Sequence, residues 1–290
     1  MEKQKILAYF GHHKCATTLM LKIINEVCDY TGRKHAYYHS PKMWGYKSGF
    51  TLNKAADENE LDFVSYTDAD LNYIGGLDRF RGIHVIRDPR DIAISAYFSH
   101  RYSHSNDEWP ELAEFRKELE RLPKDEGILE NFKFTAQLPT DGWNINLFDT
   151  MKEWNYQAEN VLEVRFEDLI RDPYQNFLAM FGFLGLLEFS EPSASSLLRH
   201  CVRKWRPRRI IELQLPASIP AWVLLMIVYQ NRFAKLAGGR KNGEEDEKSH
   251  YRKGTPGDWR KHFNEQHKQY FKEHYNDLLV KLGYESGYDW

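Results

Sequence analysis

The sequence predicts one α/β domain, spanning residues 1–290, in which a central parallel sheet is flanked by helices. Two observations predict this fold class. First, 42% of the residues are hydrophobic, which is enough for a sizeable core in a chain of 290 residues. Second, a short apolar run, a polar turn and a helix-like pattern follow one another three times, as they do in βα units. The predicted units are residues 5–11 with 17–29, 82–86 with 89–101, and 161–165 with 173–184.

The turns between these strands and helices carry the signals of helix N-termini. Asp88 precedes Pro89, so residue 88 is kept out of helical geometry and Pro89 suits the first helical position. The side chain of Asp88 is therefore available as the N-cap. The same Asp-Pro entry recurs at Asp172-Pro173. The apolar residues that follow it share one helical face and are predicted to lie in the core: Phe177, Met180, Phe181 and Leu184.

The remaining segments differ in character. Residues 103–143 are polar, and within them residues 111–122 predict a surface helix. The later part of the chain contains a densely basic run, an apolar run, a glycine-rich charged stretch that predicts a mobile loop, and a helical pattern. These are residues 199–209, 221–229, 238–250 and 263–282, respectively.

Composition narrows the classes of partner and compartment. Forty Lys and Arg oppose 42 Asp and Glu, so there is no strong overall field and a nucleic-acid partner is not expected. Cys15, Cys28 and Cys201 are too few and too scattered for a disulfide framework or a zinc site, which suits a reducing compartment. The N-terminus lacks a signal-peptide cleavage site, and the apolar run 221–229 is about half of what a bilayer crossing needs. We therefore expect a cytoplasmic protein without a transmembrane segment.

The first predicted turn, "GHHKCATT", has the composition of an anion site. Backbone N–H groups at a helix N-terminus bind anions, and here Lys14 adds a charge while Thr17 and Thr18 add hydroxyls. Ala16 keeps the turn open. This is a P-loop-like strand–loop–helix phosphate site, but the Gly-Lys-Ser/Thr end of the Walker loop is missing. A magnesium-nucleotide enzyme is therefore disfavoured, although a degenerate P-loop kinase remains an alternative.

Two further segments have the character of anion sites. Arg87 stands at the end of the second predicted strand, and Ser95 follows about two helical turns later, so that both can face the crevice outside the sheet. Near the end of the chain, "YRKGTPGDW" places Arg252, Lys253 and Gly254 before a Pro-Gly turn. Each piece alone is commonplace, whereas three on one α/β frame indicate a phosphate-binding protein.

At these places the sequence resembles the sulfotransferases that use 3′-phosphoadenosine 5′-phosphosulfate (PAPS). Their first signature, of the type Y-P-K-S-G-T-T-W, is similar to residues 12–19, and their second, R-N-P-K-D-x-x-x-S, to residues 87–95. Their third, R-K-G-x-x-G-D-W, is matched in full by residues 252–259. "VRFEDLIRDP" is similar to the family segment Y-E-D-x-x-x-D-P. The matches follow the family's order over nearly the whole chain.

The resemblance implies a donor site and shows where this chain departs from it. It implies that the first signature cradles the 5′-phosphosulfate with Lys14, Cys15, Ala16, Thr17, Thr18 and Leu19. It implies that the 3′-phosphate is held by Arg87, Ser95, Arg252, Lys253 and Gly254. Cys15-Ala16 replaces Ser-Gly, Leu19 replaces an aromatic that stacks on adenine, and Phe166 replaces a Tyr. Other apolar groups must then hold the adenine.

The resemblance also implies the reaction, which is in-line transfer of a sulfuryl group from PAPS to an acceptor hydroxyl or amine. Adenosine 3′,5′-bisphosphate (PAP) is the expected product, and no metal is required. The implied acceptor is a small molecule, a glycan or a lipid head group. Lys14 would lie where negative charge develops on the leaving phosphate. The second alternative is a non-catalytic module that keeps the nucleotide fold.

The general base is left open among several residues. In one branch of the family it is a His about twenty residues before the second signature, and Asp68 stands at that place here. In another branch it is a Glu some 20–30 residues after the loop lysine, a window that holds His35 and His39. His39 and Asp68 rank equally and His35 follows. His12 and His13 either line the acceptor site or fill the loop.

The i, i+4 pair His100 and His104 lacks the glutamate of a zinc hydrolase motif, so a metal site is not expected. Residues 199–250 lie where the family varies and are predicted to form an acceptor-side or lid segment. Within them, the basic and apolar runs have two interpretations. In the first they form a surface patch that meets a membrane or a glycan. In the second they form a basic loop and a short buried helix. The second interpretation is favoured.

Overall fold

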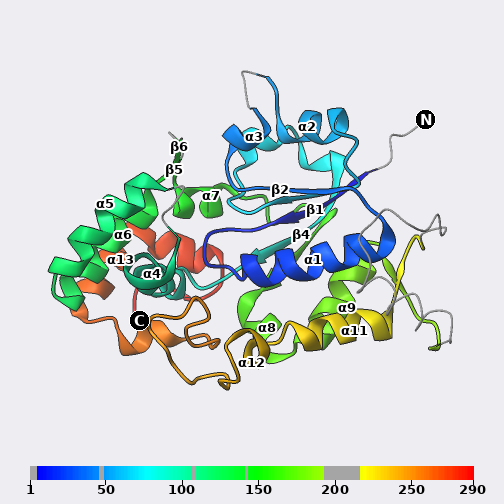
Figure 1. Ribbon diagram of the computed structural model, residues 1–290. Coiled ribbons are helices and arrows are strands. Elements are labelled where there is room, and N and C mark those ends of the chain that lie inside the picture. Colours follow the sequence, from blue (N-terminus) through cyan, green and yellow to red (C-terminus); the bar gives the residue numbers. More distant parts are fainter. Residues whose placement is uncertain (1–4, 46–48, 106–108, 141–142, 193–215) are drawn as a thin grey trace.

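The structure is a computed structural model that describes residues 5–45, 49–105, 109–140, 143–192 and 216–290. Its centre is a sheet of five parallel strands in the order β2-β3-β1-β4-β7, with helices on both sides (Figure 1). The predicted fold class is confirmed. The strands are β1 (Ile6–Phe10), β2 (His35–Tyr38), β3 (Phe63–Tyr66), β4 (Phe80–Ile86) and β7 (Val161–Arg165).

Both faces of the sheet are buried, because alternate residues of a strand point to opposite sides. In β1, Tyr9 faces the core under α1 (Thr17–Thr31), whereas Ala8 and Phe10 face a second core under α2 (Leu52–Glu58). All three side chains are fully buried. Figure 1 shows α1 and α2 on opposite sides of the sheet. This two-sided burial explains why the strand is an unbroken apolar run in the sequence.

All three predicted βα units are present. They are β1 with α1, β4 with α4 (Pro89–Phe98), and β7 with α8 (Phe166–Arg171) and α9 (Pro173–Phe183). The side chain of Asp88 accepts a hydrogen bond from the backbone N–H of Arg90 and caps α4, as predicted. Asp172 caps α9 in the same way. Helix α4 ends before residue 101 because the chain continues as the π-helical turn η3 (Ser99–Ser103).

Shorter elements join these units. The predicted surface helix is α5 (Pro110–Arg121), which buries Leu112 and Leu119. Helix α6 (Lys124–Ala136) follows it and is not among the predicted elements. The others are η1 (Pro41–Trp44), α3 (Leu71–Ile74), η2 (Leu77–Arg79), β5 (Leu138–Thr140), β6 (Trp143–Ile145), α7 (Leu147–Glu153), β8 (Leu187–Glu188), β9 (Ile219–Pro220), α12 (Phe233–Leu236) and η4 (Asp258–Lys261).

The C-terminal part closes the domain. The apolar run forms α11 (Ala221–Gln230), which packs against α1 and α9 and buries four residues: Val223, Leu224, Ile227 and Val228. The favoured interpretation of this run as a short buried helix is confirmed, whereas residues 199–209 lie outside the described residues. The predicted last helix is α13 (Glu265–Lys281). Among the described residues, no helix combines the length and the apolar character that a membrane crossing needs.

The loop at residues 238–250 contains no helix or strand, but it is extensively cross-linked. The guanidinium of Arg240 donates to the carbonyl oxygens of Glu244, Tyr251 and Arg252 and to the hydroxyl of Ser249. These bonds tie the loop to the R-K-G segment that follows it. The sequence pattern, which predicts a mobile loop, carries no signal for this long-range arrangement.

Candidate active site

The carboxyl ends of all five sheet strands open into one cavity of about 760 Å³. Each strand is followed by a residue that lines this cavity: Lys14 after β1, His39 after β2, Asp68 after β3, Arg87 after β4 and Phe166 after β7. The central strand β1 lies between β3 and β4, where the connections change direction. Open α/β sheets bind their ligands at such switch points.

The loop between β1 and α1 has an unusual backbone. Lys14 and Ala16 have φ angles of 64° and 62°, in a region that side chains with a Cβ rarely adopt and that is concentrated at functional sites. The carbonyl oxygen of His12 stabilises the turn by accepting the N–H of Cys15 (3.1 Å) and the hydroxyl of Thr17 (3.3 Å). Five predicted residues of this loop line the cavity: Lys14, Ala16, Thr17, Thr18 and Leu19.

Cys15 is placed differently from its neighbours in the loop. Its side chain is fully buried in the core below the loop and does not line the cavity. Burial raises the pKa of this thiol, so it is neutral and unreactive at ordinary pH. The sequence motif places residue 15 in the loop, but only the folded chain shows that its side chain turns inward.

Lys14 lies in a strongly positive environment. Burial lowers its pKa to about 7, and the nearby guanidinium groups of Arg87 and Arg252 add to this effect. Among the described residues, no carboxylate pairs with the Lys14 ammonium group. A buried lysine that lacks a counter-ion and lies near two arginines is a candidate binding site for an anionic ligand.

Arg87 connects the second signature to the first. Its Nη1 donates to the carbonyl oxygen of Lys14 (3.2 Å), and its guanidinium lies 4.3 Å from the centre of the Phe166 ring. Its Nε is buried and has no hydrogen-bond partner among the described residues. Ser95, one helix face along α4, also lines the cavity. Arg87 therefore keeps an unused donor next to the cavity.

A buried carboxylate on α4 holds the third signature in place. Asp91 accepts the backbone N–H groups of Gly257 (2.6 Å) and Trp259 (2.9 Å), and its side chain is fully buried. Arg252 donates to Asp258 (2.6 Å), and its guanidinium lies 4.3 Å from the centre of the Phe98 ring. These contacts place Arg252, Lys253 and Gly254 on the cavity wall, together with Lys14 and Arg87.

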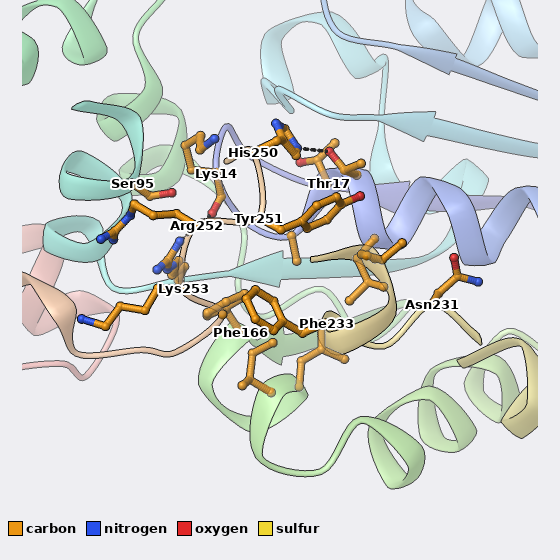
Figure 2. Close-up of a pocket in the computed structure, with 18 of the residues that line it drawn as sticks. Lys14, Thr17, Ser95, Phe166, Asn231, Phe233, His250, Tyr251, Arg252 and Lys253 are labelled. Carbon is orange, nitrogen blue, oxygen red and sulfur yellow. Dashed lines mark hydrogen bonds between the residues drawn. The ribbon is translucent and has the colours of Figure 1, made fainter. Parts of the chain in front are cut away.

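Two contacts close the other side of the donor region. Gly254 has a φ of 68°, and a Cβ there would lie only 2.5 Å from Cδ2 of Phe233. The Phe233 ring therefore rests directly on the backbone of the R-K-G segment. The hydroxyl of Thr18 lies 3.0 Å from Nε2 of His250, which ties helix α1 to the loop before this segment. Figure 2 shows this hydrogen bond and the aromatic rings of Phe166, Phe233 and Tyr251.

The predicted base candidates separate into two groups. Asp68 and His39 both line the cavity, and burial raises the pKa of Asp68 to about 7. His35 does not line it: its ring bonds to Asn25 (2.7 Å) and to Ser65 (2.9 Å) on the neighbouring strand. His35 thus joins α1, β2 and β3 and is not among the residues that line the cavity.

The structure also tests the metal prediction in its described part. There, one group of three potential ligands has its donor atoms within 4.8 Å of one another: Glu245, Asp258 and His262. Arg252 and Lys253 already donate to these two carboxylates. Cationic side chains therefore occupy the place that a metal ion would need.

Comparison with known proteins agrees with this geometry. Residues 77–204, which include Arg87, Ser95 and Phe166, match the sulfotransferase domain family. This match spans less than half of the chain. Among curated proteins, none is similar enough in sequence to count as a match.

Solved sulfotransferase structures share the fold over nearly all of this chain. The mouse sulfotransferase SULT7A1 complexed with PAP has a TM-score of 0.56 and 15% identity, covering 95% of this chain and 84% of that one. Retinol dehydratase in complex with androsterone and the inactive cofactor PAP has a TM-score of 0.54 and 16% identity, covering 94% and 80%. Lys14 and Arg252 lie outside the matched family region.

The fold brings further residues to the cavity that the motifs do not predict as site residues. His104 and Trp109 line one end, next to His13, whose place in the acceptor site the sequence left undecided. His250 and Phe233 line the donor end. The i, i+4 pair His100 and His104 is a local sequence signal for this group.

Proposed function

We propose that this protein transfers a sulfuryl group from PAPS to an acceptor hydroxyl or amine and releases PAP. The observation that carries the proposal is the convergence of Lys14, Arg87 and Arg252 on one cavity from distant parts of the chain. Within the described residues, Lys14 lacks a counter-ion and Arg87 keeps a buried Nε without a partner. A ligand with phosphates at two positions would satisfy these groups.

The two ends of PAPS fit different parts of the cavity. The 5′-phosphosulfate would lie at the N-terminus of α1, where free N–H groups and the helix dipole favour anions, with Lys14 beside it. The 3′-phosphate would be held by Arg87, Ser95, Arg252, Lys253 and Gly254. Adenine would stack on the rings of Phe166 and Phe233. These rings would take over from the family's stacking aromatic, whose position is occupied by Leu19 here. The solved neighbours were crystallised with PAP, and this supports the assignment of the donor.

The chemistry follows from the position of Lys14. As the acceptor oxygen bonds to sulfur, the bond from sulfur to the bridging phosphate oxygen breaks, and negative charge grows on that oxygen. Lys14 and the loop N–H groups would stabilise this charge more in the transition state than in the ground state. We expect Lys14→Ala to lower kcat by roughly 10²–10³.

The acceptor would enter at the end of the cavity lined by His39, Asp68, His104 and Trp109. An aromatic and partly polar wall suits a hydroxyl-bearing acceptor that also has an apolar body. Androsterone and retinol are bound by one of the solved neighbours, which supports an acceptor of this general kind. The cavity residues do not single out one compound.

A thermal-shift comparison of PAP with ADP tests the donor site. At a PAP concentration 100 times its Kd, we expect stabilisation by about 2.7 kcal/mol, whereas ADP, which lacks a 3′-phosphate, should give a clearly smaller shift. Lys14→Ala and Arg252→Ala should each reduce the PAP shift. Equal shifts with PAP and ADP in the unmutated protein would contradict a 3′-phosphate site. Stabilisation by magnesium-ATP without a response to PAP would instead favour a kinase.

A further inference from the structure

A chain of three polar side chains leads from the core to the acceptor end of the cavity. Nε2 of His13 lies 3.2 Å from Nε2 of His100, and Nδ1 of His100 lies 2.7 Å from Oδ1 of Asn131. His100 and Asn131 are fully buried, while His13 lines the cavity. His100 sits on the π-helical turn η3, a geometry that is frequent at functional sites.

The hydrogen bonds of Asn131 determine which ring nitrogens of His100 and His13 carry a proton. Its Nδ2 donates to the carbonyl oxygen of Ala93 (3.2 Å) and to the hydroxyl of Thr135 (3.2 Å), so Oδ1 must face His100. Because a carbonyl oxygen only accepts, His100 carries its proton on Nδ1 and, when neutral, presents an unprotonated Nε2. His13 then donates from its own Nε2, which leaves Nδ1 of His13 unprotonated.

The free nitrogen of His13 is accessible from the cavity. Within the described part of the chain, no hydrogen bond reaches Nδ1 of His13, and the half-buried His13 residue lines the cavity. Burial lowers the pKa of His13 well below its usual range, and the charges of His100 and Lys14 add to this effect, so the ring is neutral near pH 7. The other ionisable groups that face it are His104, His250 and Asp68, which accepts the backbone N–H of His13.

We propose that Nδ1 of His13 is the general base of the reaction, and that His100 and Asn131 are positioning residues that hold its tautomer. The inference rests on the proposed sulfuryl transfer. The proton of the acceptor hydroxyl moves to Nδ1 of His13 as the acceptor oxygen bonds to sulfur. The bond between sulfur and the bridging phosphate oxygen breaks, and PAP leaves with that electron pair. His13 becomes an imidazolium that still donates from Nε2 to His100.

Asp68 and His39 also line the cavity as base candidates, and the environment of Asp68 is less suitable than that of His13. With a pKa of about 7, a large share of its carboxyl groups is protonated near neutral pH and cannot accept a proton. Its Oδ1 is buried and without a partner among the described residues, and such burial favours the protonated carboxyl over the carboxylate that a base needs. Bound PAPS would add negative charge beside both groups and so raise the pKa of each. A higher pKa keeps more of Asp68 protonated, whereas it makes the neutral His13 a stronger base.

The first experiment measures turnover of radiolabelled PAPS with a simple phenol, with a primary alcohol and with water alone. We expect His13→Ala to lower kcat by 10²–10⁴ with an unchanged Kd for PAP, and added imidazole to restore part of the activity. Asn131→Asp should shift the acid limb of the kcat/KM profile to higher pH, because a carboxylate on His100 makes His13 more basic. His274→Ala, on the exposed face of α13, is the control and should match the unmutated protein.

A second readout needs no turnover. Nitrogen NMR of histidine-labelled protein should show His13 protonated on Nε2 and His100 on Nδ1, and Asn131→Asp should preserve both. Protonation of His13 on Nδ1 would overturn the inference. So would near-normal turnover by a PAP-binding His13→Ala variant together with a large loss in Asp68→Asn. Failure of the unmutated protein to bind PAP would overturn the proposed function instead, so the two failures are distinguishable.

Discussion

At the scale of single residues, Lys14 shows how burial changes the behaviour of a lysine. Its pKa of about 7 lies below the ordinary value of 10.5, so the empty protein holds Lys14 largely neutral above pH 7. A bound phosphate favours the charged form, and binding must then take up a proton. We expect the affinity for PAP to fall with rising pH, by up to about tenfold per unit above pH 7.

Calorimetry in buffers of different ionisation enthalpy measures this proton uptake directly. Lys14→Met, which keeps the length of the side chain without its charge, is the control and should show weaker binding with little pH dependence. Binding of PAP to the unmutated protein without proton uptake at about pH 8 would show that Lys14 is already charged in the empty cavity.

Gly254 allows a second test at residue scale. An alanine Cβ at this position would collide with Phe233, so the ring or the R-K-G backbone must move. We expect Gly254→Ala to weaken PAP binding by roughly tenfold, which is about 1.4 kcal/mol. Gly238→Ala is a matched control, because Gly238 has the same φ of 68° but nothing within 4 Å of the added Cβ. Equal effects of the two variants on PAP affinity would rule out the Phe233 contact as the cause.

At the scale of elements, α4 organises the site. Its N-terminal turn carries Asp91, which holds the third signature through two backbone N–H groups. We expect Asp91→Ala to lower the free energy of unfolding by about 3 kcal/mol, because both buried donors lose a charged acceptor. Asp91→Asn keeps one acceptor oxygen and should cost less.

Urea denaturation and PAP titration measure the two consequences of this change. PAP affinity should fall together with stability, because Arg252 would move with the released segment. Asp277→Ala is the control, since Asp277 of α13 forms an exposed ion pair with Lys152 of α7. An Asp91→Ala variant that loses stability but binds PAP normally would show that the R-K-G segment is positioned by other contacts.

The elements also show what a sequence pattern can predict. The caps Asp88 and Asp172 are local features, so the start of each helix was correctly predicted. The π-helical turn η3 depends on tertiary contacts: Arg116 of α5 donates to the carbonyl oxygens of His100 (2.6 Å) and His104 (2.6 Å). No periodicity in the sequence carries that information.

At the scale of the whole molecule, the donor site exists only in the folded chain. Hydrogen exchange measured by mass spectrometry should show PAP protecting three distant segments together: residues 11–19, 87–95 and 252–257. The hydrogen exchange of α2 and α3, which lie on the opposite face of the sheet from α1, should not change. Protection of the first segment alone would indicate a ligand bound only through its 5′ end. This result would contradict the proposed binding of both the 5′ and the 3′ phosphates.

The sequence by itself determined the α/β class, the three βα units and the cationic residues Lys14, Arg87 and Arg252. It could do so because apolar strand runs, helix caps and phosphate loops depend on neighbours in the chain. Tertiary structure alone decided that the Cys15 thiol turns into the core and that His35 stays between strands. It also decided that His13 meets His100 and Asn131, because residues 87 or more positions apart approach each other only when the sheet and its helices pack.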